Sequence, residues 1–303
     1  MSVLAALDAQ TVVDAVGLGA VYALMAVGIG LVFGVLRLVN FAYGQLIMAG
    51  AYTLAFTSSW PVPASIAACF VVVVALSMLM DRVVFRPLRG QSPAVMLVTT
   101  FAIAFMLQAI ALMIDIRDDT IGEIATSIAS FNQATTVAGV DIRKITIAAV
   151  IVAAVTLGLL ALLLARTTIG LHMRAAAADF GTARLLGVRA NRVIGFAVFL
   201  SGLLAATVAV ILTVQFPFVG PDFALRETIV VLVGVVVGGI DRLWTATLGG
   251  FAIGFATGII NGVLPTDKSV FLPSAVFALV ILVLLLRPAG LFAWGRAAAA
   301  ERV

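Results

Sequence analysis

Nine long runs of apolar residues follow one another along this 303-residue chain, and short polar links separate them. The runs cover residues 12–36, 43–58, 62–80, 94–114, 145–165, 193–214, 228–240, 248–264 and 270–286. An α-helix needs about 20 apolar residues to cross the ~30 Å hydrocarbon core of a bilayer, and in lipid it satisfies its own backbone hydrogen bonds. The pattern therefore predicts an all-α, polytopic transmembrane helical bundle of about eight or nine spans, folded as one domain over residues 1–303.

Three of these runs are shorter than a full crossing and rich in glycine. They are residues 43–58, 228–240 and 248–264. Interrupted backbone is tolerated at membrane depth only where other protein or water satisfies its polar groups. We therefore expect short, broken or re-entrant helices among these three runs.

Composition excludes several classes of function. Apolar residues make up 63% of the chain and charged residues 11%, against about 45–50% and ~25% in soluble proteins. The spans use nearly the whole length, so no soluble catalytic domain is left over. The excess of basic residues lies in short links, where it reports topology rather than a nucleic-acid partner. A single cysteine, Cys69, excludes a disulfide within the chain and disfavours a metal cluster.

The basic residues are distributed unevenly between alternate links. Thirteen of the 18 Lys and Arg residues fall in one set of links and five in the other. Because such residues stay on the cytoplasmic side, we expect the N-terminus outside and the C-terminus in the cytoplasm. The segment 166–192, with five arginines and one acid, is then cytoplasmic. The longest outer link, about 115–144, is expected to form a small cap, an amphipathic excursion or a solvated loop.

The middles of the nine runs contain no ionisable residue. Carriers driven by protons or ions usually place charged side chains within their spans, so this absence disfavours a self-powered transporter. The polar side chains in or near the runs include the amides of Asn40, Gln45 and Gln108. An amide can bond a passing solute or a neighbouring helix, and the sequence leaves both roles open.

Glycines recur at every fourth position in one run. Gly250, Gly254, Gly258 and Gly262 must form one smooth stripe along a helix, which another helix can approach closely. We expect the stripe to serve close packing within the bundle. A subunit interface or a wall of the substrate pathway is the alternative.

No motif for bond chemistry or nucleotide binding is present. The chain contains no GxxxxGK[ST] loop and no HExxH motif, and no serine has a plausible base nearby in sequence. The sequence therefore predicts no catalytic residue, no metal site and no cofactor in this chain. A transporter without a charge relay or a nucleotide site either takes its energy from a partner or is a passive channel.

Several sequence blocks together resemble one family. The first block extends from Gly19 to Tyr52 and includes Tyr22, Gly28, Phe33-Gly34, Arg37, Asn40-Phe41 and Tyr43-Gly44-Gln45. The later blocks are Phe85-Arg86-Pro87-Leu88-Arg89-Gly90, Gly170 to Gly187, Gly238-Gly239-Ile240 with Leu243-Trp244, and Arg287-Pro288-Ala289-Gly290-Leu291-Phe292. In order and over essentially the whole chain, they resemble permease subunits of branched-chain amino-acid importers of the ATP-binding cassette (ABC) type.

The resemblance implies a multi-pass protein of the bacterial inner membrane that acts in a complex. Its expected partners, besides the lipid bilayer, are a second homologous permease subunit, two cytoplasmic ATPase subunits that bind ATP and Mg, and an extracytoplasmic solute-binding protein. The implied cargo is branched-chain or other amino acids; urea or short amides, or a passive channel for a small neutral solute, are the alternatives. Tyr43 stands where members often have His, and Asp241-Arg242 stands where they often have Gly. Tyr43 therefore joins the candidate pathway residues.

The resemblance also gives the segment 166–192 a role. In ABC permeases a cytoplasmic helix docks on the ATPase, and Ala183-x-x-x-Gly187 is similar to the core of that coupling motif. Gly181 and Thr182 occupy the places where an acidic residue is usual. The candidate coupling residues are Arg174, Asp179, Ala183, Arg184 and Gly187. A basic loop that faces anionic lipid headgroups is the alternative.

Overall fold

The computed structural model describes residues 9–36, 40–88, 91–118, 132–137, 140–239 and 242–286. The first half contains α1 (Ala9–Leu36), α2 (Tyr43–Phe56), α3 (Val62–Met80) with a π-helical continuation over Asp81–Phe85, α4 (Pro93–Asp118), β1 (Ala134–Val137) and β2 (Val140–Arg143). The second half contains α6 (Lys144–Arg166), α7 (Thr168–Ala178), α8 (Phe180–Leu185), α9 (Ala190–Gln215), α10 (Leu225–Gly238), α11 (Leu243–Val263), a 3-10 helix (Thr266–Phe271) and α12 (Leu272–Leu286).

Seven helical segments are long and apolar enough to cross a membrane. They are Ala9–Leu36, Val62–Phe85, Ala94–Ile114, Lys144–Arg166, Asn191–Gln215, Leu243–Val263 and Asp267–Leu286. The two remaining helices that correspond to predicted runs, α2 and α10, have only 14 residues each. The predicted helical bundle with some short helices is confirmed, and the full-length candidates number seven in the described part of the chain.

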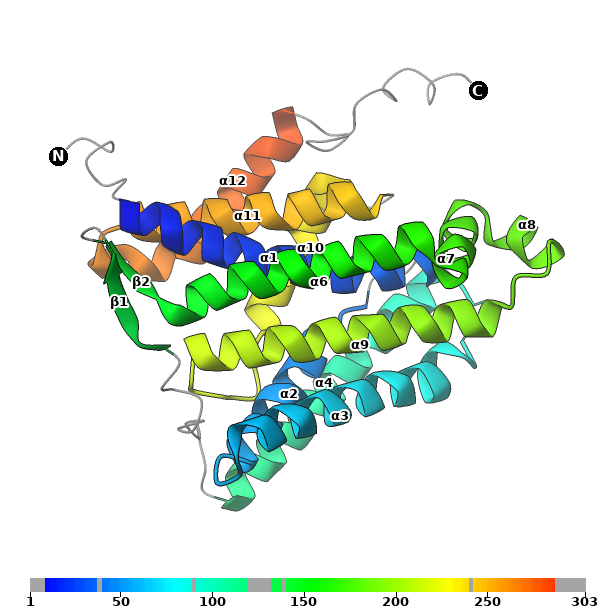
Figure 1. The fold of residues 1–303 in the computed structure, drawn as a ribbon, viewed down its shortest axis with the longest axis horizontal. Coiled ribbons are helices and arrows are strands. Elements are labelled where there is room, and N and C mark those ends of the chain that lie inside the picture. The colour runs from blue at the N-terminus through cyan, green and yellow to red at the C-terminus, as the bar shows by residue number, and fades with distance from the viewer. Residues whose placement is uncertain are drawn as a thin grey trace.

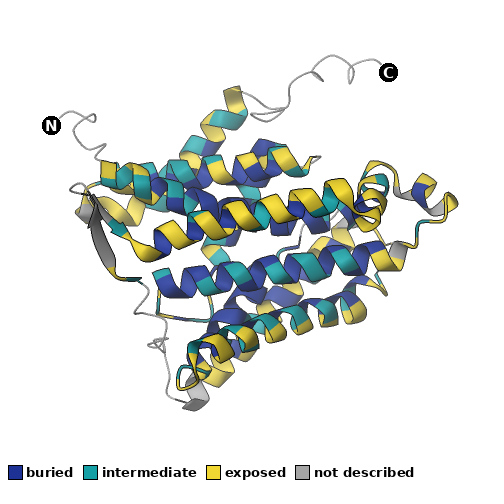
Figure 2. Ribbon diagram, viewed as in Figure 1, coloured by how far each residue is buried: buried dark blue, intermediate teal, exposed yellow. Residues whose placement is uncertain are grey.

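Helix α1 lies at the centre of the bundle and packs against α6, α9, α10 and α11 (Figure 1). Most of the apolar window of α1 and of α9 is buried, 83% and 78% respectively, whereas α4 and α6 bury only 17% of theirs (Figure 2). The exposed faces of α4 and α6 carry large apolar side chains such as Phe105 and Leu159. Because water would disfavour so much apolar surface, these faces are the lipid-facing surface of a multi-pass membrane protein.

Buried hydroxyl groups join the helices at the centre. Ser201 on α9 donates a hydrogen bond of 2.8 Å to the carbonyl oxygen of Gly28 on α1, and Ser77 on α3 donates one of 2.9 Å to the carbonyl oxygen of Val198 on α9. Small side chains of this kind let helix backbones approach closely and add an interhelical bond in lipid. The seams of α9 with α1 and with α3 are fixed in this way.

The bundle has two distinct ends (Figure 1). One end, called the α7–α8 end, is where α6 ends, where α7 and α8 follow it, and where α9 and α11 begin. At the hairpin end, β1 and β2 pair antiparallel, with Ala134 opposite Arg143, just before α6 begins. The sequence did not predict this hairpin in the link 115–144; residues 119–131 of that link lie outside the described residues.

Candidate functional site

Helices α2 and α10 begin next to each other inside the bundle. At 1.5 Å per residue each is about 21 Å long, which is shorter than the ~30 Å core of a bilayer. A Cβ atom placed on Gly44, in the first turn of α2, would lie 2.5 Å from Thr228 Oγ1 and 3.0 Å from the carbonyl oxygen of Ala224. Ala224 and Thr228 belong to the start of α10 and are both buried. Only glycine allows this approach.

The loop between α9 and α10 brings the chain back into the bundle. In this loop the Phe223 N–H donates to the Gly220 carbonyl, and the Leu225 N–H donates to the Asp222 carbonyl. Ala224 has φ 63° and ψ 3°, which places a non-glycine residue in the left-handed region just before α10. Such a conformation costs about 1–2 kcal/mol. Strain of this kind clusters at functional sites.

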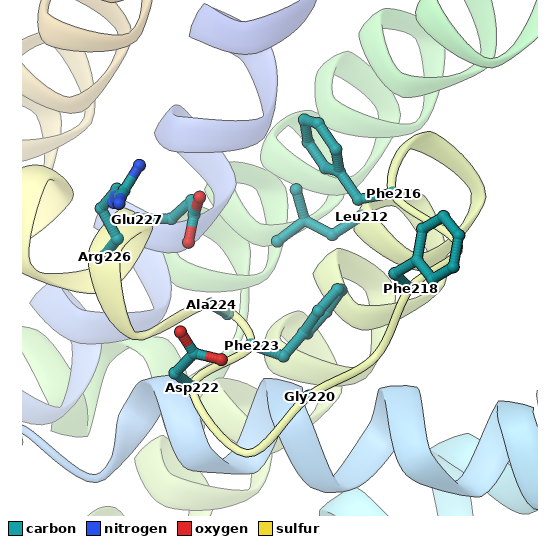
Figure 3. Close-up of a pocket in the computed structure, with 9 residues that line it drawn as sticks. All are labelled: Leu212, Phe216, Phe218, Gly220, Asp222, Phe223, Ala224, Arg226 and Glu227. Carbon is teal, nitrogen blue, oxygen red and sulfur yellow. The ribbon is translucent and has the colours of Figure 1, made fainter. Parts of the chain in front are cut away.

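A pocket of about 200 Å³ lies where this loop meets α9 and α10 (Figure 3). Its wall includes Leu212, Phe216, Phe218 and Phe223 together with the charged residues Asp222, Arg226 and Glu227. Figure 3 shows Arg226 and Glu227 on one side of the pocket and Phe216 and Phe218 on the other. The volume is below the ~300–1,000 Å³ of sites for drug-sized ligands, so the pocket suits a small solute.

The charged residues at this pocket belong to the loop before α10 and to its first turn. Arg226 was assigned to an outer link, and Arg226 and Glu227 are the second and third residues of α10. Asp222 and Arg226 are exposed, and Glu227 is half-buried. They lie beside the bundle because α10 starts where Gly44 of α2 approaches Ala224 and Thr228. Ionisable side chains next to membrane-spanning helices are candidates for function.

The four predicted pathway residues lie around α2 and α4. Asn40 is buried and accepts a hydrogen bond of 3.1 Å from the Ala42 N–H, an arrangement that turns the chain into α2. Tyr43 and Gln45 are fully buried, and Tyr43 Oη and both amide atoms of Gln45 have no hydrogen-bond partner. Gln108 is half-buried on α4. The pocket beside α10 is lined by other residues.

The glycine stripe of α11 packs against α1. A Cβ atom on Gly254 would lie 2.8 Å from the Cα of Gly19 and 2.8 Å from the Cβ of Tyr22. Gly250 lies against Ala26 and Tyr22, Gly258 against Ala15, and Gly262 against Thr11. Both partners in this seam belong to one chain, so the close approach expected of the stripe occurs within the bundle.

The segment 166–192 forms α7 and α8, and Figure 1 shows α8 projecting from the bundle. Thr167 caps α7 by accepting a hydrogen bond of 3.0 Å from the Gly170 N–H. A Cβ atom on Gly170 would lie 2.5 Å from the Leu164 carbonyl oxygen, so this glycine permits the tight corner between α6 and α7. Arg174 on α7 lines a cavity of about 570 Å³ that also contacts α1, α6 and α11.

Asp179 and Gly187 define the two ends of α8. Asp179 Oδ1 accepts hydrogen bonds from the N–H groups of Gly181 (2.9 Å) and Thr182 (3.2 Å). Hydrogen bonds from the Thr182 hydroxyl and backbone, and from the Gly181 N–H, hold the pKa of the Asp179 carboxyl below its ordinary value. Gly187 has φ 90°, and the Val188 N–H bonds the Ala183 carbonyl at 3.0 Å. This pattern is a Schellman-type end, which favours glycine.

Two leucines between these points were missed by the sequence reasoning. Leu185 is 89% exposed and Leu186 is 80% exposed, at the end of α8 that projects from the bundle (Figure 2). Ala183 in the same helix is buried at 3%; the side chain of Arg184 lies outside the described set. The sequence signal that could have identified the two leucines is their position between Ala183 and Gly187 of the candidate coupling motif. An exposed pair of leucines on a projecting helix is typical of a docking surface.

Comparison with known proteins identifies the family. The family model described as the permease component of branched-chain amino acid transport systems matches residues 11–286. This chain belongs to that permease family. The permease protein BraD of Pseudomonas aeruginosa, named as part of a high-affinity branched-chain amino acid transport system, is 30% identical over 294 residues, covering 93% of this chain and 94% of BraD. LivH of Escherichia coli K12 is 27% identical over 299 residues, with the same coverage of both chains.

Solved structures of ABC transporters share the fold of this permease. An inward-facing transporter described as of the metal-chelate ABC type superposes with a TM-score of 0.53 at 17% identity, over 92% of this chain and 86% of that chain. PsaBC from Streptococcus pneumoniae superposes with a TM-score of 0.50 at 11% identity, over 91% of both chains. The α-helical bundle of this chain therefore has the same overall fold as the matching chains of these two structures.

Proposed function

We propose that this chain is the permease subunit of an ABC importer that moves branched-chain amino acids into the cytoplasm. The observation that carries the proposal is the family match over residues 11–286, together with relatives such as BraD that align over nearly their whole length. The chain would span the bacterial inner membrane beside a second homologous permease. Two cytoplasmic ATPase subunits would bind ATP and Mg, and an extracytoplasmic binding protein would deliver the solute.

The orientation that fits this role places the α7–α8 end in the cytoplasm. The preference of Lys and Arg for cytoplasmic links supports it, because the arginine-rich segment 166–192 lies at that end. The hairpin end then faces the binding protein. The pocket beside α10 is lined by the loop that follows the C-terminus of α9, and this C-terminus lies at the hairpin end.

Helix α8 is the element that we expect to dock on the ATPase. Leu185 and Leu186 supply the apolar contact, since burying an exposed leucine against a partner contributes about 1.5–3 kcal/mol. Asp179 and Gly187 hold the two ends of the helix, Ala183 is buried, and α8 contacts α7. Arg174 and Arg184 are the further candidate coupling residues of this basic segment. Movement of the ATPases on ATP binding would then be transmitted through α7 to α6 and α1, which α7 contacts.

The experiment replaces the exposed leucines and measures ATP-driven uptake. The double variant Leu185→Asp, Leu186→Asp should fold normally, because both side chains are exposed. It should lose uptake of radiolabelled leucine in proteoliposomes that contain the permease pair, the ATPases and the binding protein. ATPase subunits should also fail to copurify with it. A bulky replacement of Ala183 or Gly187 should have the same effect on uptake.

Val270→Asp is the matched control. Val270 is 82% exposed in the 3-10 helix at the other end of the bundle, so this variant carries the same chemical change away from the ATPases and should still copurify with them. Full ATP-driven uptake by the double leucine variant would refute the docking role. Solute flux through the permease without ATPases would indicate a passive channel instead.

A further inference from the structure

The pocket at the start of α10 carries both signs of charge beside an apolar wall. Asp222 and Glu227 present carboxylates and Arg226 a guanidinium, and the rings of Phe216 and Phe218 lie across the pocket from Arg226 and Glu227 (Figure 3). In the part of the chain that the structure describes, no direct ion pair joins Arg226 to either acid. Each charged group therefore retains hydrogen-bonding capacity toward a ligand.

The position of these groups in the bundle requires a reason for their presence. Glu227 is half-buried in the first turn of α10, and α10 starts where Gly44 of α2 approaches Ala224 and Thr228. A carboxylate partly removed from water inside a membrane bundle is costly. A purely structural helix start would avoid this cost with neutral side chains. The strained Ala224, with φ 63°, fixes the turn that directs the chain from Asp222 into α10.

We infer that this pocket is a transit site for a zwitterionic α-amino acid with an apolar side chain, an inference that rests on the proposed function. Glu227 and Asp222 would bind the ammonium group, and Arg226 would bind the carboxylate in the two-pronged geometry that guanidinium favours. Leu212 and the phenylalanine rings would contact the apolar side chain. Urea and short neutral amides lack both charges and would gain little from such a site.

The position fits a site that a solute passes through rather than one that retains it. The pocket is formed by a loop and the start of a half-length helix, with Asp222 in the loop and Arg226 and Glu227 in the first turn of α10. A conducting site must bind well enough to admit the solute and weakly enough to release it. Arg226 and Asp222 are exposed, so solvent screening weakens their contacts with the solute, which suits brief occupancy.

The first experiment uses the complete transporter in proteoliposomes, with radiolabelled leucine as the probe. Glu227→Gln and Arg226→Gln should each lower leucine uptake by roughly 10- to 100-fold, the range expected for loss of one hydrogen bond to a charged group. ATP hydrolysis stimulated by the binding protein should persist in both variants. Asp267→Asn and Lys268→Gln remove the same charges at an exposed position outside the pocket and should leave uptake unchanged.

The results separate this inference from the proposed function. A wild-type complex that shows no ATP-driven leucine uptake would refute the proposed function itself. A working wild type with unchanged uptake in both pocket variants would overturn the transit site alone. If a variant loses both stimulated ATP hydrolysis and uptake, its defect is structural. A labelling measurement then decides whether leucine occupies the pocket.

The labelling measurement avoids changing any charged group. Phe218 is 67% exposed at the pocket, and the only natural thiol, Cys69, is buried. In the complete transporter, a thiol introduced by Phe218→Cys should react with a water-soluble maleimide several-fold more slowly in the presence of leucine, but not of urea. Val270→Cys, which is exposed elsewhere, should react at the same rate with either solute. Equal reaction rates at Phe218→Cys with leucine, with urea and without solute would overturn the inference.

Discussion

The seam between α1 and α11 offers a quantitative test of the packing. An alanine at position 254 would place its Cβ 2.8 Å from the Gly19 Cα and the Tyr22 Cβ and 2.9 Å from the Leu18 carbonyl oxygen. Carbon atoms in normal contact lie about 3.5–4.0 Å apart. Two of the three nearest atoms are backbone atoms, so a change of rotamer cannot relieve the clash. The helices must separate by about 0.7 Å or more.

The cost of this separation follows from the contacts it weakens. A gap of 0.5–1 Å loses about a quarter to a half of each dispersion contact, which is worth about 0.1–0.2 kcal/mol. A seam comparable to one buried leucine has about 40–60 atom contacts; with central values of about 50 contacts, ~0.15 kcal/mol each and a loss of about a third, it loses about 2–3 kcal/mol. The higher helix propensity of alanine returns about 1 kcal/mol. We expect Gly254→Ala to lower the free energy of unfolding by about 1–2 kcal/mol, and Gly254→Leu to prevent assembly of the bundle.

The measurement is reversible unfolding in mixed detergent and SDS micelles, followed by reaction of the buried Cys69 with a thiol dye. Gly158→Ala is the matched control, since Gly158 lies inside α6 and an added Cβ meets no atom within 4 Å. That variant should be neutral or slightly more stable than the wild type. Equal stability of Gly254→Ala and Gly158→Ala would show that the two helices do not pack through the glycine stripe as described.

Two further predictions concern the loop before α10 and the cap of α8. Ala224→Gly should raise the free energy of unfolding by about 1 kcal/mol, because glycine adopts φ 63° without the left-handed penalty; an unchanged or lower value in the same SDS titration would contradict the strain. Hydrogen bonds lower the pKa of the Asp179 carboxyl in the folded protein. The stabilisation from the Asp179 cap is therefore complete above the pKa that this carboxyl has in the unfolded chain. It is lost only as the pH falls through the lowered pKa of the folded protein. Titration of Asp179 should therefore leave ATP-driven uptake unchanged between pH 8 and 5, whereas Asp179→Ala should reduce uptake throughout that range. A loss of uptake near pH 6 in the wild type, but not in Asp179→Ala, would contradict the capping role of Asp179.

Local hydropathy predicted the positions of the helices closely. The run 62–80 coincides with α3, and the run 145–165 lies within α6. The shortness of α2 and α10 was also foreseen, since a run of apolar residues reports its own length. The hairpin of β1 and β2 was not predicted, because each strand has only four residues and the alternation of Val140–Arg143 is too short to stand out from a polar loop. The exposure of Leu185 and Leu186 was missed because leucines in an apolar protein are normally expected in lipid or in the core.

The sequence by itself determined that this chain is a membrane-embedded bundle of the branched-chain amino acid permease family, with a basic segment between α6 and α9. Those features depend on local hydropathy, on the spacing of glycines and on short motifs. Only the tertiary structure decided that the glycine stripe meets α1 and that the start of α10, with Arg226 and Glu227, lies against α2. The depth of a side chain depends on where its helix begins relative to neighbouring helices. For α10 that point is set by the close approach of Gly44 to Ala224 and Thr228, about 180 residues later in the chain.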